Sequence, residues 1–187
     1  MATLSALIFA TVDGAMAAVA EVRILATARS LVPLDAATVA WRPVEFRPGL
    51  RRATELQPRA PMGAGFWNLL FNHLFLLPMA AAEVGIPAQS LTGSLARLGI
   101  QDDFLRTGQR RLTRGTSALF LLTNDANVDP VIGLLASLPF TVTSTNLSTR
   151  QLEALRAAFG TGPLDICDED RSVLRATEIN GVPQGRS

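Results

Sequence analysis

The sequence predicts a mixed α+β domain in which a strand–helix–strand unit occurs twice. The first observation is that short apolar runs alternate with segments of helical periodicity in both halves of the chain. The second is an uncharged apolar stretch between these halves, GAGFWNLLFNHLFLLPMAAA at 63–82. The third is a polar, acidic end after residue 160. With 187 residues, the chain is long enough for one domain with its own core.

The first unit begins with an apolar, β-compatible run at Leu4–Phe9, which predicts a strand. Asp13 is a residue type that caps helices. The helix that we expect after it carries one apolar face, made of Ala15, Val19, Val22 and Ala26. A second strand is expected at Ala36–Trp41.

The connector at 42–61 is rich in Arg and Pro, and we expect it to be extended, with a short strand at Val44–Arg47. The apolar stretch that follows is interrupted by Pro78, Gly85 and Pro87, which argues against one straight helix. Two helical arms, roughly Gly63–Leu77 and Ala88–Leu98, fit the pattern better.

The second unit repeats the first in outline. It is preceded by a helix expected from Asp102 to Leu112, and its strands are expected at Ser117–Thr123 and Phe140–Thr145. Asp129 followed by proline predicts a helix start between these strands. A last helix begins with a capping box of Ser148 and Gln151 and is closed by Gly160; its apolar positions are Leu152, Leu155 and Phe159.

This order is typical of a ferredoxin-like βαβ-βαβ sandwich, with both helices on one face of the sheet. We therefore expect a single domain at 1–160, with an apolar helical hairpin inserted at about 63–100 between strands two and three. A C-terminal helix ends the domain, and a polar tail follows at 161–187.

Several segments resemble an uncharacterised bacterial family, domain of unknown function 1269, whose members are usually described as predicted membrane proteins. The segments are DAATVAW at 35–41, FWNLLFNHLFLLP at 66–78, LGIQDDF at 98–104, RGTSALFLLT at 114–123 and TNLSTRQLEALRAAFG at 145–160. The resemblance covers about residues 1–160 and implies membrane association without an enzymatic activity. The insert is atypical, because Asn68 and Asn72 stand where the family has small residues.

The insert is about as long as a helix needs to cross a bilayer. Arginines flank it on both sides, which favours both ends on the cytoplasmic side and so requires a hairpin. The segment that would have to cross back contains Glu83, Gln89 and Arg97, and a charge at mid-bilayer costs about 2.5–3.5 kcal/mol. The alternatives are a shallow interfacial hairpin or burial against identical inserts in a soluble oligomer.

The expected oligomer or membrane contacts are the apolar side chains of the first arm and two asparagines that share a helix face. They are Phe66, Trp67, Asn68, Leu70, Phe71, Asn72, Leu74 and Phe75. Asn68 and Asn72 hydrogen-bond across a helix–helix seam and set its register, face water on an amphipathic helix, or belong to a functional polar site. Contact with anionic headgroups is expected from Arg106, Arg110 and Arg111.

The sequence contains no pattern that indicates a catalytic or metal-binding site. His73 is the only histidine and has no acidic or thiol neighbour in sequence, so a hydrogen-bonded or contact role is expected. Cys167 is the only cysteine, which excludes an internal disulfide and favours a reducing compartment. The acidic residues around Cys167 are expected to be solvated rather than to bind a metal. We expect no cofactor, no metal and no catalytic site.

Nucleic acid is not an expected partner, because the net charge is only +1 and no stacking aromatics interleave with the arginines. The sequence therefore predicts a non-enzymatic protein that binds copies of itself, the lipid bilayer, or both. We expect it at the cytoplasmic side of the membrane or in a soluble assembly. The alternative is a small-ligand-binding or regulatory module with the ligand held between sheet and insert.

Overall fold

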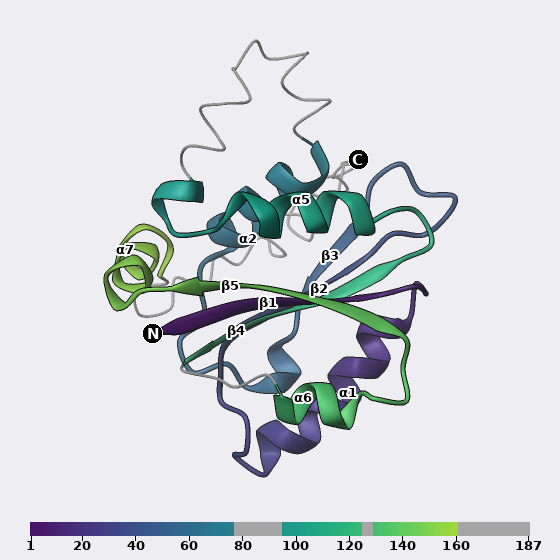
Figure 1. The fold of residues 1–187 in the computed structure, drawn as a ribbon, viewed down its shortest axis with the longest axis horizontal. Helices are drawn as coiled ribbons and strands as arrows, with labels where there is room; N and C mark the ends of the chain where they lie inside the picture. The colour runs from purple at the N-terminus through teal and green to yellow at the C-terminus, as the bar shows by residue number, and fades with distance from the viewer. Residues whose placement is uncertain (77–94, 125–128, 161–187) are drawn as a thin grey trace, which may run out of the picture.

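The structure is a computed structural model that describes residues 1–76, 95–124 and 129–160 (Figure 1). It is a mixed α+β fold built on one five-stranded, fully antiparallel sheet. The strands are β1 (Ala2–Phe9), β2 (Pro33–Ala40), β3 (Gly49–Arg52), β4 (Ser117–Asn124) and β5 (Phe140–Leu147). Their order across the sheet is β3-β2-β4-β1-β5, so the first and second strands of each predicted unit are separated by a strand of the other unit.

The four main strands lie where the sequence predicts them, with ends shifted by up to three residues. The short strand of the connector does not: it forms at Gly49–Arg52 instead of Val44–Arg47. Here Leu50 pairs with Val39, so the chain must first turn back through 41–48 before it can run antiparallel to β2. Val44 and Phe46 are consequently in the turn and not in the sheet.

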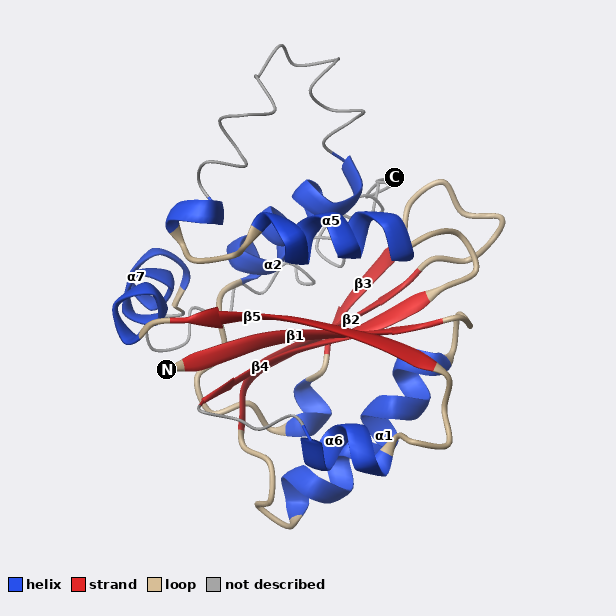
Figure 2. Cartoon of the chain, in the orientation of Figure 1, coloured by secondary structure: helices blue, strands red, loops and turns tan. Residues whose placement is uncertain are grey.

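One face of the sheet is covered by α1 (Gly14–Thr27) and α6 (Asp129–Leu134), which lie side by side below the sheet in Figure 2. Their core includes Leu7, Phe9, Val19 and Leu119. Asp13 is the N-cap residue of α1, but its side chain makes no capping hydrogen bond. The Ala15 N–H donates instead to Ser117 Oγ of β4 at 2.9 Å, so a neighbouring strand supplies the cap.

The other face is covered by α2 (Ala64–Phe71), the π-helical turn η2 (Asn72–Leu76) and α5 (Asp102–Arg111), drawn above the sheet in Figure 1. The first arm of the insert is therefore helical, as predicted, and packs on the chain's own sheet. Its core partners on the strands include Leu4, Ile8, Val39 and Phe120. The second arm lies mostly outside the described residues, which resume with a helical turn at 95–97.

The chain ends, within the described residues, in α7 (Thr149–Phe159) at one end of the sheet. Both hydrogen bonds of the predicted Ser148–Gln151 capping box are formed. The Gln151 N–H donates to the Ser148 side chain, and the Ser148 N–H donates to the Gln151 side chain. Gly160 follows as the C-cap and forms an isolated bridge with Met62, which holds the end of α7 against the start of the insert. The tail at 161–187, including Cys167, is outside the described residues.

Candidate functional site

The apolar side chains predicted as intermolecular contacts lie inside the domain. Phe66, Trp67, Leu70, Phe71 and Leu74 are all buried. Phe75 is half-buried and packs edge-on against Trp41, with ring centroids 5.6 Å apart. Phe71 similarly meets Phe120 of β4 edge-on at 5.0 Å. These aromatic rings cover the sheet of their own chain, so in this structure they form no exposed contact surface.

The two asparagines of the first arm are exposed on its outer side. Asn68 and Asn72 are one turn apart, and both side chains face solvent. This exposed position agrees with the water-facing expectation. It follows from the helix burying its aromatic stripe on the sheet.

A buried carboxylate that sequence reasoning missed attaches the insert to the sheet. Asp35 lies on β2 at a register shift, and its side chain is 1% exposed. Asp35 Oδ2 accepts hydrogen bonds from the Met62 N–H at 2.7 Å and from Trp67 Nε1 at 2.8 Å. Arg52 Nη2 lies 3.3 Å from Oδ1 and supplies the opposite charge. A buried carboxylate needs such partners, so Asp35 has a structural role at the root of the insert.

The most exposed of the large apolar side chains lie in the loop between β2 and β3. Val44 and Phe46 are each 87% exposed, more than any other large hydrophobic residue described. The loop is held at its base, because the Trp41 N–H donates to the Thr116 carbonyl and the Gly115 N–H donates to the Trp41 carbonyl. Trp41 Nε1 also donates to the Glu45 carbonyl at 3.1 Å. The tip is thus presented on a fixed base. We call residues 41–48 the apolar-tipped loop.

Exposed arginines lie in this loop and at the same end of the sheet. Arg42 and Arg47 belong to the loop itself, and Arg114 stacks on Phe46 with its Cζ 5.8 Å from the ring centroid. Arg110 is in the last turn of α5, which ends at the same end of the sheet (Figure 1). Glu45 is the one acidic residue of the loop, and it pairs with Arg42 at 3.5 Å. We call these four arginines with Val44 and Phe46 the arginine corner.

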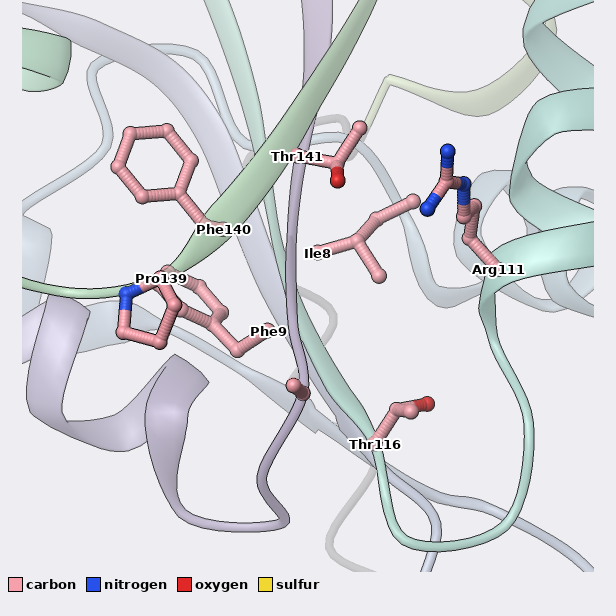
Figure 3. Close-up of a pocket in the computed structure, with 8 residues that line it drawn as sticks. Ile8, Phe9, Arg111, Thr116, Pro139, Phe140 and Thr141 are labelled. Carbon is pink, nitrogen blue, oxygen red and sulfur yellow. The ribbon is translucent and has the colours of Figure 1, made fainter.

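The three arginines predicted from sequence to contact headgroups all lie on α5 and are exposed. Arg110 belongs to the arginine corner. Arg106 lies one turn earlier on α5 and is 3.8 Å from Asp102, so part of its charge is balanced. Arg111 lines a hollow at the ends of the strands (Figure 3). The corner also includes Arg42, Arg47 and Arg114. The sequence signal for Arg42 and Arg47 was the Arg/Pro-rich connector with two apolar residues inside it, whereas Arg114 lies in the turn before β4.

Residues 61–160 match a family described as "Protein of unknown function (DUF1269)". The match covers more than half of the 187 residues. The chain belongs to the DUF1269 family. The DUF1269 match contains the insert, the second strand–helix–strand unit and α7, whereas the resemblance seen in the sequence also includes the first unit. No curated protein and no solved structure matches the chain.

The DUF1269 segment also contains the only histidine, on the π-helical turn η2. His73 is buried, and its Nδ1 has no hydrogen-bond partner. Burial lowers the pKa of His73 below its ordinary value, and the negative charge of Asp102 opposes this shift. Its carbonyl accepts a hydrogen bond from Gln109 Nε2 at 3.1 Å, which joins η2 to α5. His73 is therefore a packed contact residue between the insert and α5.

The described part of this DUF1269 protein has neither a metal-binding cluster nor a membrane-spanning helix. At 1–76, 95–124 and 129–160, no three or more His, Cys, Asp or Glu side chains are grouped so that they could hold a metal ion. Over the same residues, every helix is too short or too polar to cross a bilayer.

Proposed function

We propose that the protein is a non-enzymatic, peripheral membrane-binding protein that docks on anionic lipid through the arginine corner. The observation that carries this proposal is the exposure of Val44 and Phe46, 87% each, among four arginines. Apolar side chains beside basic ones are the composition that binds at the boundary between headgroups and acyl chains. The cytoplasmic leaflet, with its anionic lipids, is the surface that this corner fits.

The apolar contribution comes from the tip of the loop. Moving a Phe or Val side chain fully out of water gains roughly 1.5–3 kcal/mol. The backbone hydrogen bonds of Trp41 hold the loop in place, so little conformational entropy is lost when the tip inserts. Two such side chains give weak, reversible membrane binding rather than permanent anchoring.

The charged contribution comes from the arginines around the tip. Each basic residue near an anionic surface contributes about 1 kcal/mol, and this falls off over the Debye length. Arg42 is partly offset by Glu45, so Arg47, Arg110 and Arg114 carry most of the attraction. Together with the apolar tip, this gives affinity for anionic membranes and little for neutral ones.

Sedimentation of the full chain with lipid vesicles tests this proposal. We expect binding to vesicles that contain phosphatidylglycerol and little binding to vesicles of phosphatidylcholine alone. Phe46→Ser should weaken partitioning about tenfold, equivalent to about 1.4 kcal/mol. Ile24→Ser is the matched control, because Ile24 is 60% exposed on α1, on the other side of the sheet. Equal losses in both variants, or none in Phe46→Ser, would show that the corner is not the lipid contact.

Self-association is a second candidate function. The edge strand β5 is a more suitable contact between two copies than the insert is. β5 lies at the end of the sheet and pairs with β1 over eight residues without a bulge. It contains no charged residue and no proline, the usual protections of an exposed edge. Antiparallel pairing of two β5 strands about a two-fold axis would extend the sheet across two copies.

Sedimentation velocity distinguishes this candidate from a monomer. We expect a dimer that Ser144→Lys disrupts, because two lysines would face each other near the two-fold axis. Ala157→Lys on the exposed side of α7 adds the same charge away from β5 and should leave the dimer intact. A wild-type monomer at every concentration would rule self-association out.

We further infer that the fold is ferredoxin-like with an insert. The order β2-β4-β1-β5 and the placement of α1 and α6 on one face support this assignment. The segment between β3 and β4 would then be an insertion that covers the face which the basic fold leaves open.

A further inference from the structure

We infer that the acidic segment LDICDED at 164–170 binds the arginine corner of its own chain and competes there with anionic lipid. This inference rests on the proposed lipid contact and supplies its regulation. The segment itself lies beyond the described residues. Three observations support the inference: the unbalanced charge of the corner, the composition of the segment, and the position of Gly160, where the described chain ends.

The arginine corner carries positive charge that its neighbours leave unbalanced. Glu45, the acidic residue of the loop, pairs with Arg42 at 3.5 Å. Within the described residues, none of Arg47, Arg110 and Arg114 forms an ion pair. Arg114 stacks on an aromatic ring, which carries no net charge. Three of the four arginines are therefore available to an anionic group.

The segment matches both chemical features of the corner. Guanidinium groups and carboxylates form charge-assisted hydrogen bonds, so an acidic chain suits the free arginines. Val44 and Phe46 are each 87% exposed, and apolar side chains laid over them would remove them from water. The segment supplies both kinds of group, four acidic and two large apolar residues: Asp165, Asp168, Glu169 and Asp170, with Leu164 and Ile166.

The corner is within reach of the segment. Gly160 bridges to Met62, and the Met62 N–H donates to Asp35 near the start of β2. The corner begins at Trp41, directly after the other end of β2, so the two points are separated by about the length of that strand. An eight-residue strand measures roughly 26 Å, whereas the chain from Gly160 to Asp170 spans up to about 35 Å. The acidic residues can therefore contact the arginines without any change in the domain.

Attachment to the same chain lets this contact compete with lipid. A tethered segment acts on its site at an effective concentration of about millimolar. An anionic membrane presents many charges to the corner at once and displaces the segment, whereas a neutral membrane offers nothing to replace the lost ion pairs. The segment thus covers the apolar tip away from membranes and sharpens the preference for anionic lipid.

Cys167 permits a direct test, because it is the only cysteine and lies in the middle of the segment. A bimane label on Cys167 of the full chain is quenched on contact with tryptophan. Trp41 is half-buried at the base of the corner, whereas Trp67 is 1% exposed and cannot touch the label. We expect quenching that Trp41→Phe relieves and that phosphatidylglycerol vesicles relieve in the unsubstituted protein. Fluorescence that Trp41→Phe leaves unchanged, or quenching that rises with protein concentration and so arises between copies, would overturn the inference.

Neutralising the acidic residues tests the competition with lipid. The variant with Asp165→Asn, Asp168→Asn, Glu169→Gln and Asp170→Asn should lose the quenching and partition about tenfold more strongly to phosphatidylglycerol vesicles. The matched control removes four exposed acidic residues of the domain, through Asp13→Asn, Glu21→Gln, Asp103→Asn and Glu153→Gln. We expect less than a twofold change in this control. Equal gains in both variants would show an effect of net charge alone and would contradict a contact between segment and corner.

The two readouts separate this inference from the lipid contact itself. If the labelled protein is unquenched but binds phosphatidylglycerol vesicles, the contact of the segment is wrong and the lipid contact stands. If Trp41 quenches the label but no variant binds vesicles, the lipid contact is wrong, and the competition with lipid is wrong with it.

Discussion

The indole Nε1 of Trp67 donates a 2.8 Å hydrogen bond to Oδ2 of Asp35, and both side chains are buried between the sheet and the insert. The two residues are thirty-two positions apart in sequence. Through this bond, the first helix of the insert is oriented by a charged group of β2. Nonspecific apolar packing alone would let the helix slide or rotate, whereas the hydrogen bond requires one position.

Asp35→Asn should therefore destabilise the fold strongly. The amide would retain one acceptor but place an N–H₂ group among donors, and it would leave Arg52 without its counter-charge. We expect a loss of about 3 kcal/mol in the free energy of unfolding, measured by urea denaturation. Glu153→Gln, on the exposed side of α7, is the matched control and should change stability by less than about 0.5 kcal/mol. A small effect for Asp35→Asn would show that the carboxylate is not essential to the packing.

The Trp67–Asp35 bond can be measured separately by a double-mutant cycle. Trp67→Phe removes the indole donor while it keeps an aromatic ring in the stack with Phe71, whose centroid is 5.8 Å away. With Asp35→Ala as the second substitution, which removes both acceptor oxygens, we expect a coupling free energy of about 1.5 kcal/mol, as for a hydrogen bond to a charged group. Additive single effects would instead indicate that Trp67 stabilises the insert through ring packing only.

His73 predicts a pH dependence of stability. Because burial lowers its pKa in the folded state, the unfolded chain binds a proton more readily. Stability is therefore unaffected by His73 above its ordinary pKa of about 6.5, and it falls as the pH decreases from there toward the lower folded-state pKa. Since His73 is the only histidine, His73→Gln should remove this slope between about pH 6.5 and 5, before carboxylates titrate. Parallel unfolding curves of both proteins over this range would contradict the prediction.

Gly108 predicts a steric limit where α5 meets the insert. A Cβ at this position would lie 2.8 Å from Cδ2 of Leu74, which is buried. Gly→Ala in a helix usually gains about 1 kcal/mol. We expect Gly133→Ala in α6 to show this gain, because nothing lies within 4 Å of its Cβ position. Gly108→Ala should lose the gain or be destabilising. Equal gains at both glycines in thermal unfolding would mean that Leu74 moves aside freely.

The sequence alone determined most of the secondary structure. Apolar runs such as Ser117–Thr123, and local signals such as the Ser148–Gln151 box, depend on neighbouring residues and predict their elements well. The β3 position was wrong, because it depends on where the chain turns back to pair with β2 and not on the residues at 44–47. Asp13 is the N-cap residue of the first helix, but its side chain makes no capping hydrogen bond, for a similar reason. The Ala15 N–H donates instead to the hydroxyl of Ser117, which belongs to a strand distant in sequence.

Only the tertiary structure decided what the apolar insert covers. Its composition shows that it must leave water, but the same stripe of Phe66, Leu70 and Leu74 could bury against lipid, a second copy or its own sheet. In the fold, the open face of the sheet carries Leu4, Ile8 and Phe120, and a covalently tethered helix reaches it at a far higher effective concentration than any partner. The same arrangement leaves Val44 and Phe46 exposed beside the arginines. The sequence thus shows directly which segment is apolar. The surface against which that segment packs depends on contacts between distant segments.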